Sequence, residues 1–382
     1  MHVIVPKKSL AEGLTHVERI IPTRSSNPGL SLVRIELGES GLICSGSNLD
    51  IDIEATIPAE VAGRGEIAIP AQVFGQIVRA LPGDQVSLQF TDPSESDPSE
   101  SENAFKNGFT NGFRRELAIE SGSYATKLQL SELAAPRVTF PAHYGGRLRG
   151  SDLAAALANV RYAVAIAEYQ AIFRGVKLEF GQGTRAVATD GFRLAYYHLE
   201  EATGLAGAVV LPSRSVDELI KLLSDDEAKL ELTDTQLTVS TGRFRLNLKL
   251  MEGSFPDYQR VIPSQFDLHL TLDAKGLAEA VSRVALLADK TTNHRVDFFI
   301  NQGALQITAE GTYGRSQETL TVVHEGPELQ MALAYNAKYL VDALQPIQGK
   351  ARLSLSGRTS PSVLLSLEDP GYLAMVVPLR TA

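Results

Sequence analysis

The stretch with the most distinctive chemistry is Ala188-Thr-Asp-Gly-Phe-Arg-Leu-Ala-Tyr196, near the middle of the chain. Its Asp190-Gly191 pair has strong turn chemistry, and apolar side chains recur at every second position after it, which predicts a tight β-hairpin. Arg193 faces opposite to that apolar set, beside the hydroxyl of Thr189 and a glycine that lets a ligand approach the backbone. The pattern fits either a docking point for a partner or an ordinary turn with a solvated arginine.

Motifs for catalysis and cofactor binding are missing. The sequence contains no G-x-x-x-x-G-K-[ST] phosphate loop, no G-x-S-x-G turn, no H-E-x-x-H and no paired cysteine motif. Gly181-Gln-Gly183 is not continued into a dinucleotide fingerprint, and no histidine stands near Thr189-Asp190 in the pattern to act as a base. We therefore expect no catalytic residue, no metal and no cofactor, although scattered carboxylates could still meet in an unrecognised active site.

Length and composition predict a large globular protein. With 382 residues, 44% apolar and 21% charged, the chain can bury a sizeable core in two or three domains. No apolar run approaches the ~20 residues that cross a bilayer, and the first residues lack a signal peptide's ordered regions, so we expect a cytoplasmic location. The single cysteine, Cys44, excludes an intramolecular disulfide and is expected to be buried in a strand.

An apolar helical stripe occurs three times along the chain, and a second helix follows it each time. The first stripe is Leu10, Leu14, Val17 and Ile21, repeated as Leu153, Leu157, Val160 and Val164 and as Leu277, Val281, Val284 and Ala288. The second helix is marked by Phe74, Ile77, Val78 and Leu81, by Val216, Leu219, Ile220 and Leu223, and by Leu340, Ala343, Leu344 and Ile347. Expected N-caps are Ser9, Ser151 and Asn336, while Pro70 and Pro212 suit a first helical turn.

Alternating apolar runs lie between and after these helices and predict strands. The clearest runs are 30–37, 51–57, 176–180, 230–239, 244–250, 296–300 and 363–367. Each repeat thus reads helix, strands, helix, strands, which predicts an α+β fold of three tandem similar domains, each with two helices packed on antiparallel sheet. We expect the domains to span 1–143, 144–264 and 265–382. The Pro/Ser/Glu-rich tract at 92–112 is expected to be a disordered acidic insertion.

Basic residues recur on the predicted helices of this acidic chain, whose net charge is −9. The residues concerned are Arg24, Arg79, Arg161, Lys221 and Arg283. They are either solvated helix faces or one positive face that holds phosphates without reading bases. The net charge itself argues against a protein that coats nucleic acid with its whole surface.

The last residues, Met375 to Ala382, are expected to form an apolar strand that runs almost to the end of the chain. As a core strand it needs no functional explanation. Val377, Pro378, Leu379 and Arg380 stop too close to the terminus to be covered by later chain, however, so they could also flank a groove.

Three motifs together carry a family resemblance: ATDGFRLA at 188–195, FPDYQRVIP at 255–263 and VVPLR at 376–380. In this order within three repeats, they resemble the β sliding clamps of bacterial DNA polymerase III, and the resemblance covers essentially the whole chain. It implies a non-catalytic processivity factor, a head-to-tail homodimer whose six similar domains close a ring around double-stranded DNA regardless of sequence. Leu286 and Leu287 on one side and Leu128 on the other match the dimer contact.

The resemblance also implies a pocket, between the second and third repeats, for linear peptides of the polymerase, the clamp loader and repair proteins. Its lining would be Phe173, Thr189, Gly191, Phe192, Arg193, Leu194, Pro256, Arg260, Val261, Asn336, Tyr339, Pro361, Met375, Val377, Pro378, Leu379 and Arg380. Apolar members such as Leu194 and Leu379 would desolvate the peptide, and the arginines would ring it with donors. Phe192 stands where relatives can carry histidine, and the chain ends in Thr381-Ala382, so the peptide preference is open.

Asymmetry among the repeats favours docking over an ordinary turn. The turns equivalent to Asp190-Gly191 read Ser47-Asn48-Leu49-Asp50 and Glu310-Gly311-Thr312-Tyr313, and neither has an arginine at the matched position. Two alternatives stay open beside the clamp. One is an enzyme with an unrecognised active site in a domain cleft, and the other is a ring or filament scaffold that never contacts DNA.

Overall fold

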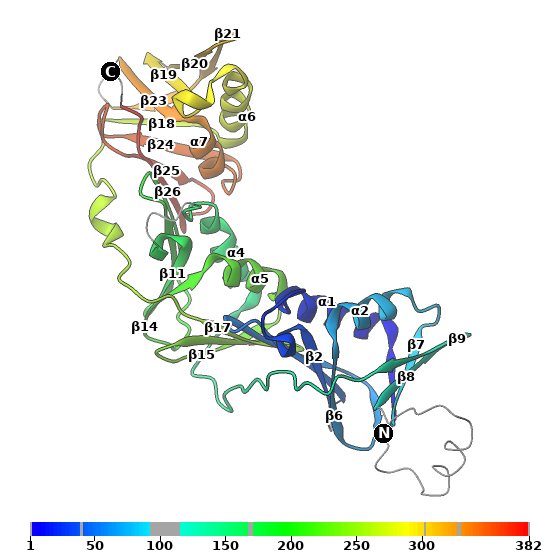
Figure 1. Ribbon diagram of the computed structural model, residues 1–382. Coiled ribbons are helices and arrows are strands. Elements are labelled where there is room, and N and C mark those ends of the chain that lie inside the picture. Colours follow the sequence, from blue (N-terminus) through cyan, green and yellow to red (C-terminus); the bar gives the residue numbers. More distant parts are fainter. Residues whose placement is uncertain are drawn as a thin grey trace, which may run out of the picture. The chain divides into compact units, whose positions relative to one another are not determined.

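The computed structural model describes residues 2–38, 41–91, 115–166, 171–301, 303–326 and 330–380. The predicted insertion at 92–112 and the chain end Thr381-Ala382 lie outside them. Packing divides the chain into two compact units, and Figure 1 labels many of their elements. Unit 1 contains Met1–Gly145 and Asp226–Lys249, and unit 2 contains Gly146–Asp225 and Leu250–Ala382.

Unit 1 is built from one helix pair and two antiparallel sheets. Its helices are α1 (Lys7–Ile20) and α2 (Ala71–Ala80), with a short 3-10 turn η1 (Pro28–Ser31). One sheet has the order β5-β1-β7-β8-β9, and the other contains the run β15-β16-β17-β4-β3-β2-β6. The strands are β1 (His2–Pro6), β2 (Leu32–Gly38), β3 (Gly41–Ser47), β4 (Ile51–Ile57), β5 (Glu60–Ala62), β6 (Gly65–Pro70), β7 (Gln85–Thr91), β8 (Glu116–Ser121), β9 (Tyr124–Gln129), β15 (Glu227–Leu232), β16 (Gln236–Thr241) and β17 (Phe244–Lys249).

Unit 2 contains two helix pairs and two further antiparallel sheets, of order β14-β11-β12-β13-β26-β25-β24-β18-β22 and β21-β20-β19-β23. Its helices are α4 (Gly150–Arg161), α5 (Ser213–Leu222), α6 (Ala274–Val284) and α7 (Ala337–Leu344), with 3-10 turns η3 (Ala171–Arg174), η4 (Tyr258–Val261), η5 (Ala285–Leu287) and η6 (Lys290–Thr292). The strands are β10 (Gly146–Arg149), β11 (Gly175–Phe180), β12 (Thr184–Thr189), β13 (Arg193–Leu199), β14 (Gly207–Pro212), β18 (Leu268–Asp273), β19 (Arg295–Asn301), β20 (Ala304–Gly311), β21 (Gly314–Thr321), β22 (Val323–Glu325), β23 (Met331–Asn336), β24 (Lys350–Leu355), β25 (Ser362–Ser366) and β26 (Tyr372–Val376).

All six predicted helices are present, and most of each predicted stripe is buried; α1 buries Leu10, Leu14 and Val17. Four members of the predicted stripes are only half-buried, namely Ile77, Ile220, Leu223 and Ala288. The expected caps were wrong in two cases, because Ser9 and Ser151 lie inside α1 and α4. The preceding strands run directly into these helices, so the N-cap falls on the last strand residue. Asn336 is an N-cap as expected, since its side chain accepts from the backbone N–H of Lys338 and Tyr339. Pro70 and Pro212 stand one position earlier than expected, at the N-cap itself.

Three predicted strands differ from the structure. The run 30–37 begins in the 3-10 turn η1, so strand β2 starts only at Leu32. The run 230–239 is not one strand but the end of β15, a turn, and the start of β16, because a turn closed by Thr233 and Gln236 interrupts it. The C-terminal run is a strand only as far as Val376. Cys44 lies buried in β3 as expected, and burial raises the pKa of its thiol to about 12.

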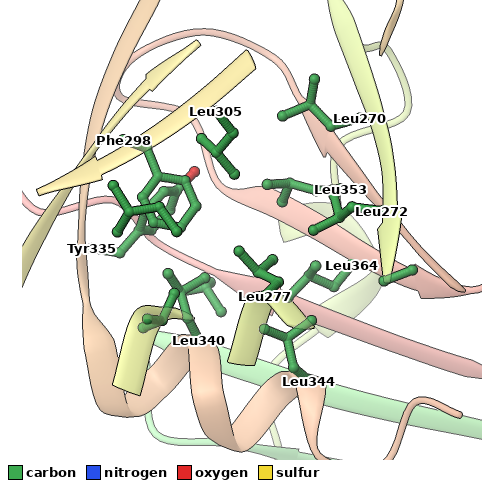
Figure 2. Close-up of a cluster of buried hydrophobic side chains, with 14 of the residues drawn as sticks. Leu270, Leu272, Leu277, Phe298, Leu305, Tyr335, Leu340, Leu344, Leu353 and Leu364 are labelled. Atoms are coloured by element: carbon green, nitrogen blue, oxygen red, sulfur yellow. The ribbon is translucent and has the colours of Figure 1, made fainter. Parts of the chain in front are cut away.

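The core of the third repeat lies between its helix pair and both of its sheets. Figure 2 shows Leu277 of α6 with Leu340 and Leu344 of α7, beneath side chains of β18, β19, β20, β24 and β25. The rings of Phe298 and Tyr335 meet edge to face at 5.2 Å. Full burial of each such side chain contributes about 1.5–3 kcal/mol, so the amphipathic stripe explains the packing of the helices on sheet.

Sheets in both units are continuous from one repeat to the next. In unit 1, β17 of the second repeat pairs with β4 of the first, with Leu246 opposite Ile53. In unit 2, β26 of the third repeat pairs with β13 of the second, with Leu194 opposite Met375. The α+β fold of three similar domains is confirmed, while domain limits at 143 and 264 stay predictions. Strands β9 and β21 are each at the edge of their sheet.

The turn between β11 and β12 offers a stability test with an internal control. A Cβ added at Gly183 would lie 2.6 Å from the backbone oxygen of Leu199, whereas one at Gly181 would meet nothing within 4 Å. We expect Gly183→Ala to lower the free energy of unfolding by about 1–3 kcal/mol, since backbone cannot yield to the added methyl. Gly181→Ala should be neutral or stabilise by up to about 1 kcal/mol. Denaturant unfolding of both variants checks this, and equal effects would contradict it.

Candidate functional site

The turn between β12 and β13 is held by its own polar side chains. Thr189 Oγ1 accepts from the N–H of Gly191 at 3.1 Å and donates to the carbonyl of Arg193 at 2.7 Å. Asp190 Oδ1 accepts from the N–H groups of Phe192 and Arg193 at 2.9 and 3.0 Å. Gly191 has a φ of 89°, a conformation that suits glycine. Phe192 lies in this turn with its side chain 62% exposed, rather than in the strand that follows.

The matching turn of the first repeat has the same construction. Ser47 Oγ accepts from the N–H of Leu49 at 3.0 Å, and Asn48 Oδ1 accepts from Asp50 and Ile51 at 3.0 and 2.8 Å. Leu49 has a φ of 76°, close to that of Gly191. Ile51 therefore takes the place of Arg193, so the turn conformation needs no arginine.

Arg193 is buried, with only 4% of its surface exposed. Its Nε donates to Asp190 Oδ2 at 3.0 Å, and its Nη1 donates to Asp342 Oδ2 in α7 at 2.6 Å. The guanidinium carbon lies 4.5 Å from the ring centre of Tyr339 and 5.5 Å from that of Tyr162. The arginine is therefore neither a solvated charge nor a free donor. It is a paired, stacked cation inside the protein.

The end of the chain lies beside this turn and beside β23. After β26 ends, the N–H of Val377 donates to the carbonyl of Phe192 at 2.9 Å, and that of Leu379 donates to Ala334 at 2.7 Å. These bonds hold an irregular tail between the hairpin turn and β23. We call the turn 189–193, the connector 255–261 and the tail 377–380 the docking surface.

The connector is anchored to β11 by a small polar and aromatic cluster. Tyr258, 4% exposed, donates its hydroxyl to Glu179 Oε2 at 2.7 Å, and Lys177 pairs with Glu179 Oε1 at 2.6 Å. The ammonium of Lys177 lies 5.7 and 5.3 Å from the ring centres of Phe255 and Tyr258. Burial alone would raise the pKa of Glu179, but hydrogen bonds from Lys177 and Tyr258 lower it below its ordinary value.

The seventeen residues matched to the pocket are brought into one region but differ in accessibility. One apolar cluster contains Leu194, Met375, Tyr258 and Val363, the last of which is close to Pro361 in the chain. Phe173 packs edge to face on Phe255. The buried members are Thr189, Arg193, Leu194, Met375 and Pro378; Phe173, Asn336, Tyr339, Pro361, Val377 and Leu379 are half-buried; Gly191, Phe192, Pro256, Arg260, Val261 and Arg380 are exposed. Leu194 and Arg193 thus offer almost no surface to a ligand.

The five basic residues expected to face DNA are mostly ion-paired. Arg79 of α2 pairs with Glu18 of α1 at 2.8 Å, and Arg161 of α4 makes two hydrogen bonds to Asp217 of α5 at 2.7 and 2.8 Å. A further pair within α5 joins Lys221 to Glu218 at 2.8 Å.

In the third repeat, Arg283 of α6 holds Glu318 of β21 through two hydrogen bonds, at 3.0 and 2.7 Å. Arg24 is exposed. Arg79 therefore ties α1 to α2, Arg161 ties α4 to α5, and Arg283 joins α6 to β21.

The residues matched to a dimer contact lie near the two sheet edges. Leu128 is half-buried in the edge strand β9. Leu286 is 83% exposed, and its neighbour Leu287 in η5 is half-buried. Among the described residues, no group of acidic, histidine and cysteine side chains could hold a metal ion, and no helix is long and apolar enough to span a membrane.

Comparison with known proteins identifies the family. Residues 1–106 match the N-terminal domain of the DNA polymerase III beta subunit, residues 147–257 its central domain, and residues 259–380 its C-terminal domain. The chain belongs to the β sliding clamp family. It is 28% identical to the beta sliding clamp of Caulobacter vibrioides and 27% identical to that of Lactococcus lactis, with 98% or more of every chain covered. A solved sliding clamp from Pseudomonas aeruginosa bound to griselimycin has a TM-score of 0.85 and 25% identity, both chains being covered completely.

Membership in the clamp family gives the function at the level of the whole chain, which is that of a non-catalytic processivity factor of DNA polymerase III. The sequence motifs mark the three segments of the docking surface but not the groups that hold them, namely Asp342, Tyr162 and Lys177. Asp342 stands four positions after Lys338 on α7, a spacing that by itself indicates a surface ion pair. Nothing in the local pattern indicated an arginine 149 residues earlier as its partner.

We expect Glu179→Gln to loosen the connector by removing a charged partner of Lys177 and Tyr258. Because its pKa is lowered in the folded protein, Glu179 stabilises the fold above the ordinary glutamate pKa, and this contribution disappears as pH falls through the lowered value. The variant should be about 1 kcal/mol less stable at pH 7, the partly exposed site being screened by solvent.

The difference should shrink progressively below about pH 4.3. Denaturant unfolding at several pH values measures it, and Glu200→Gln, at an exposed position just after β13, is the control. A difference between Glu179→Gln and the native protein that grows as pH falls would contradict the assignment.

Proposed function

We propose that two copies of this chain close head to tail into a ring around double-stranded DNA. The observation that carries this is the repeated strand pairing. Strand β4 of the first repeat pairs with β17, the last strand of the second repeat, and β13 of the second repeat pairs with β26, the last strand of the third. By the same rule β21 requires the last strand of a further repeat, and β9, the last strand of the first repeat, is an unpaired edge. Pairing β21 with β9 of a second copy satisfies both edges, and a contact between different surfaces closes into a ring when its rotation is right.

The chemistry of the helix pairs suits sliding. Arg79, Arg161, Lys221 and Arg283 each share their charge with a carboxylate, so phosphates would be attracted weakly and without reference to base sequence. The net charge of −9 further limits adhesion to DNA. Retention then depends on topology rather than on affinity, which is the property that a processivity factor needs. A replication clamp of this kind acts in the cytoplasm.

The docking surface is proposed to bind linear peptide segments of the polymerase, the clamp loader and repair proteins. Its accessible apolar side chains are Phe192, at 62% exposure, Val261, at 50%, and the half-buried Val377 and Leu379. Arg260 and Arg380 are exposed cations beside them. Apolar anchors with a polar rim are typical of sites for short peptides.

Retention on circular DNA tests the ring. The protein should remain bound to a nicked circle after loading and should be lost when the circle is linearised, because a threaded ring slides off free ends. Leu286→Asp should abolish retention by placing a charge in the copy-to-copy contact, whereas Leu49→Asp, at another exposed leucine, should not. Gel filtration of eluted complexes with multi-angle light scattering measures both DNA association and mass.

Equal loss from circular and linear DNA would instead favour ordinary groove binding, and no binding to either would favour a scaffold that never contacts DNA.

Replacement of Leu379 tests the docking surface. Leu379→Asp should weaken binding of a fluorescein-labelled clamp-binding peptide of DNA polymerase III at least about tenfold, since a charge replaces an apolar contact. The Leu379 N–H bond to Ala334 is a backbone bond and survives, so dimer mass and thermal stability should stay unchanged. Fluorescence polarisation measures the affinity. Unchanged affinity would show that the peptide docks elsewhere.

A further inference from the structure

Arg193 belongs to the docking surface and is charged, yet its guanidinium is buried and is not accessible to a peptide. Only 4% of it is exposed, and two of its three guanidinium nitrogens already donate to Asp190 and Asp342. Tyr339 and Tyr162 lie within 4.5 and 5.5 Å of its central carbon. The remaining N–H groups of the guanidinium are covered, so a peptide could reach them only if this buried side chain moved, which would disturb its ion pairs.

The first repeat shows what Arg193 is not needed for. Its hairpin makes the same turn bonds with Ile51, 1% exposed, in the equivalent place. The arginine is therefore not required to form the turn. The interaction that distinguishes Arg193 is its pair with Asp342, which joins the hairpin of the second repeat to a helix of the third.

A second link runs parallel to this pair. The hydroxyl of Tyr162, just after α4, lies 2.8 Å from the hydroxyl of Tyr372, which donates to the carbonyl of Ala343 in α7 at 2.8 Å. The first turn of α7 carries Asn336 and Tyr339, both matched to the peptide site. Whatever fixes α7 against the hairpin therefore fixes these residues relative to Phe192.

We propose that Arg193 is a positioning residue whose buried pair with Asp342 sets the hairpin turn against α7 before a peptide arrives. It acts on the peptide through Phe192 and Tyr339 and does not contact it through its own nitrogens. The proposal rests on the proposed docking function. Arginine suits this role because its planar fork can bond two carboxylates while its faces stack on aromatic rings, which lysine cannot do. A surface fixed in advance lowers the ordering cost of binding.

A double-mutant cycle tests this in the full-length dimer with two probes, the labelled polymerase peptide and griselimycin, which the Pseudomonas aeruginosa clamp binds. We expect Arg193→Lys and Asp342→Asn each to weaken peptide binding about tenfold or more. The double variant should bind the peptide as tightly as the single variant with the lower affinity, because both replacements break the same link. If Arg193 instead contacts the peptide, Asp342→Asn frees its guanidinium. Affinity that is unchanged or tighter in Asp342→Asn, or strictly additive losses, would overturn the proposal.

Controls separate positioning from general damage. Lys338→Ala removes the exposed partner of Asp342, at 3.0 Å, and should leave affinity within about twofold. In Asp342→Asn, amide hydrogen exchange should quicken at residues 190–193 and 377–379 but not in β11 and β12, and dimer mass should not change. Exchange that quickens throughout unit 2 would mean a structural role only and would overturn the proposal.

An apolar double variant covers the case in which a single replacement fails to fold. Arg193→Met with Asp342→Leu removes both charges together, which buried pairs often tolerate. It should fold and recover part of the lost affinity, and a folded double variant with no recovery in affinity would count against positioning. A native protein that binds neither probe would refute the docking function itself, whereas normal binding by Asp342→Asn would refute only the role of Arg193.

Discussion

The structure depends on the pairing of strands between consecutive repeats, which joins their sheets at two places in the chain. One strand series in each repeat ends at β4, β13 or β21. The last strand of the next repeat pairs with β4 and with β13. Both pairings are antiparallel and join equivalent strands, so the same connection between repeats occurs twice in the chain. The matching edge of the third repeat, β21, has no partner strand among the described residues of one copy. The proposed contact between two copies would use the same backbone hydrogen bonding that builds the sheets.

Charge is used within the helix pairs rather than displayed on them. The interhelical pair of the first repeat has its arginine on the second helix and its carboxylate on the first, and the second repeat has the reverse, with Arg161 facing Asp217. In both repeats the two helices are thus joined by one ion pair. A protein that must travel along DNA without adhering to it gains from this arrangement, since each free phosphate contact would add to the salt-dependent affinity.

The matched turns of the first two repeats differ in one buried residue. Side chains in the turns at 47–50 and 189–192 accept hydrogen bonds from equivalent backbone N–H groups, and both turns have a residue with positive φ, but Ile51 is matched by Arg193. An apolar residue at this position serves the core. A charged one is tolerated only where carboxylates and aromatic rings receive it, and these come from the hairpin itself, from the end of α4 and from α7. The buried arginine therefore depends on elements that are far apart in sequence.

The sequence by itself determined the three repeats, the six helices with their buried faces, the α+β class and the family, because apolar periodicity and short motifs are local signals that survive without coordinates. It also marked the three segments proposed for docking. Only the tertiary structure decided that Arg193 and Leu194 are buried, that the tail leaves the sheet after Val376, and that the helix cations are paired. These outcomes rest on partners such as Asp342, which are distant in the chain. Ion pairing and strand continuation depend on which residues meet in space, and no local spacing encodes that.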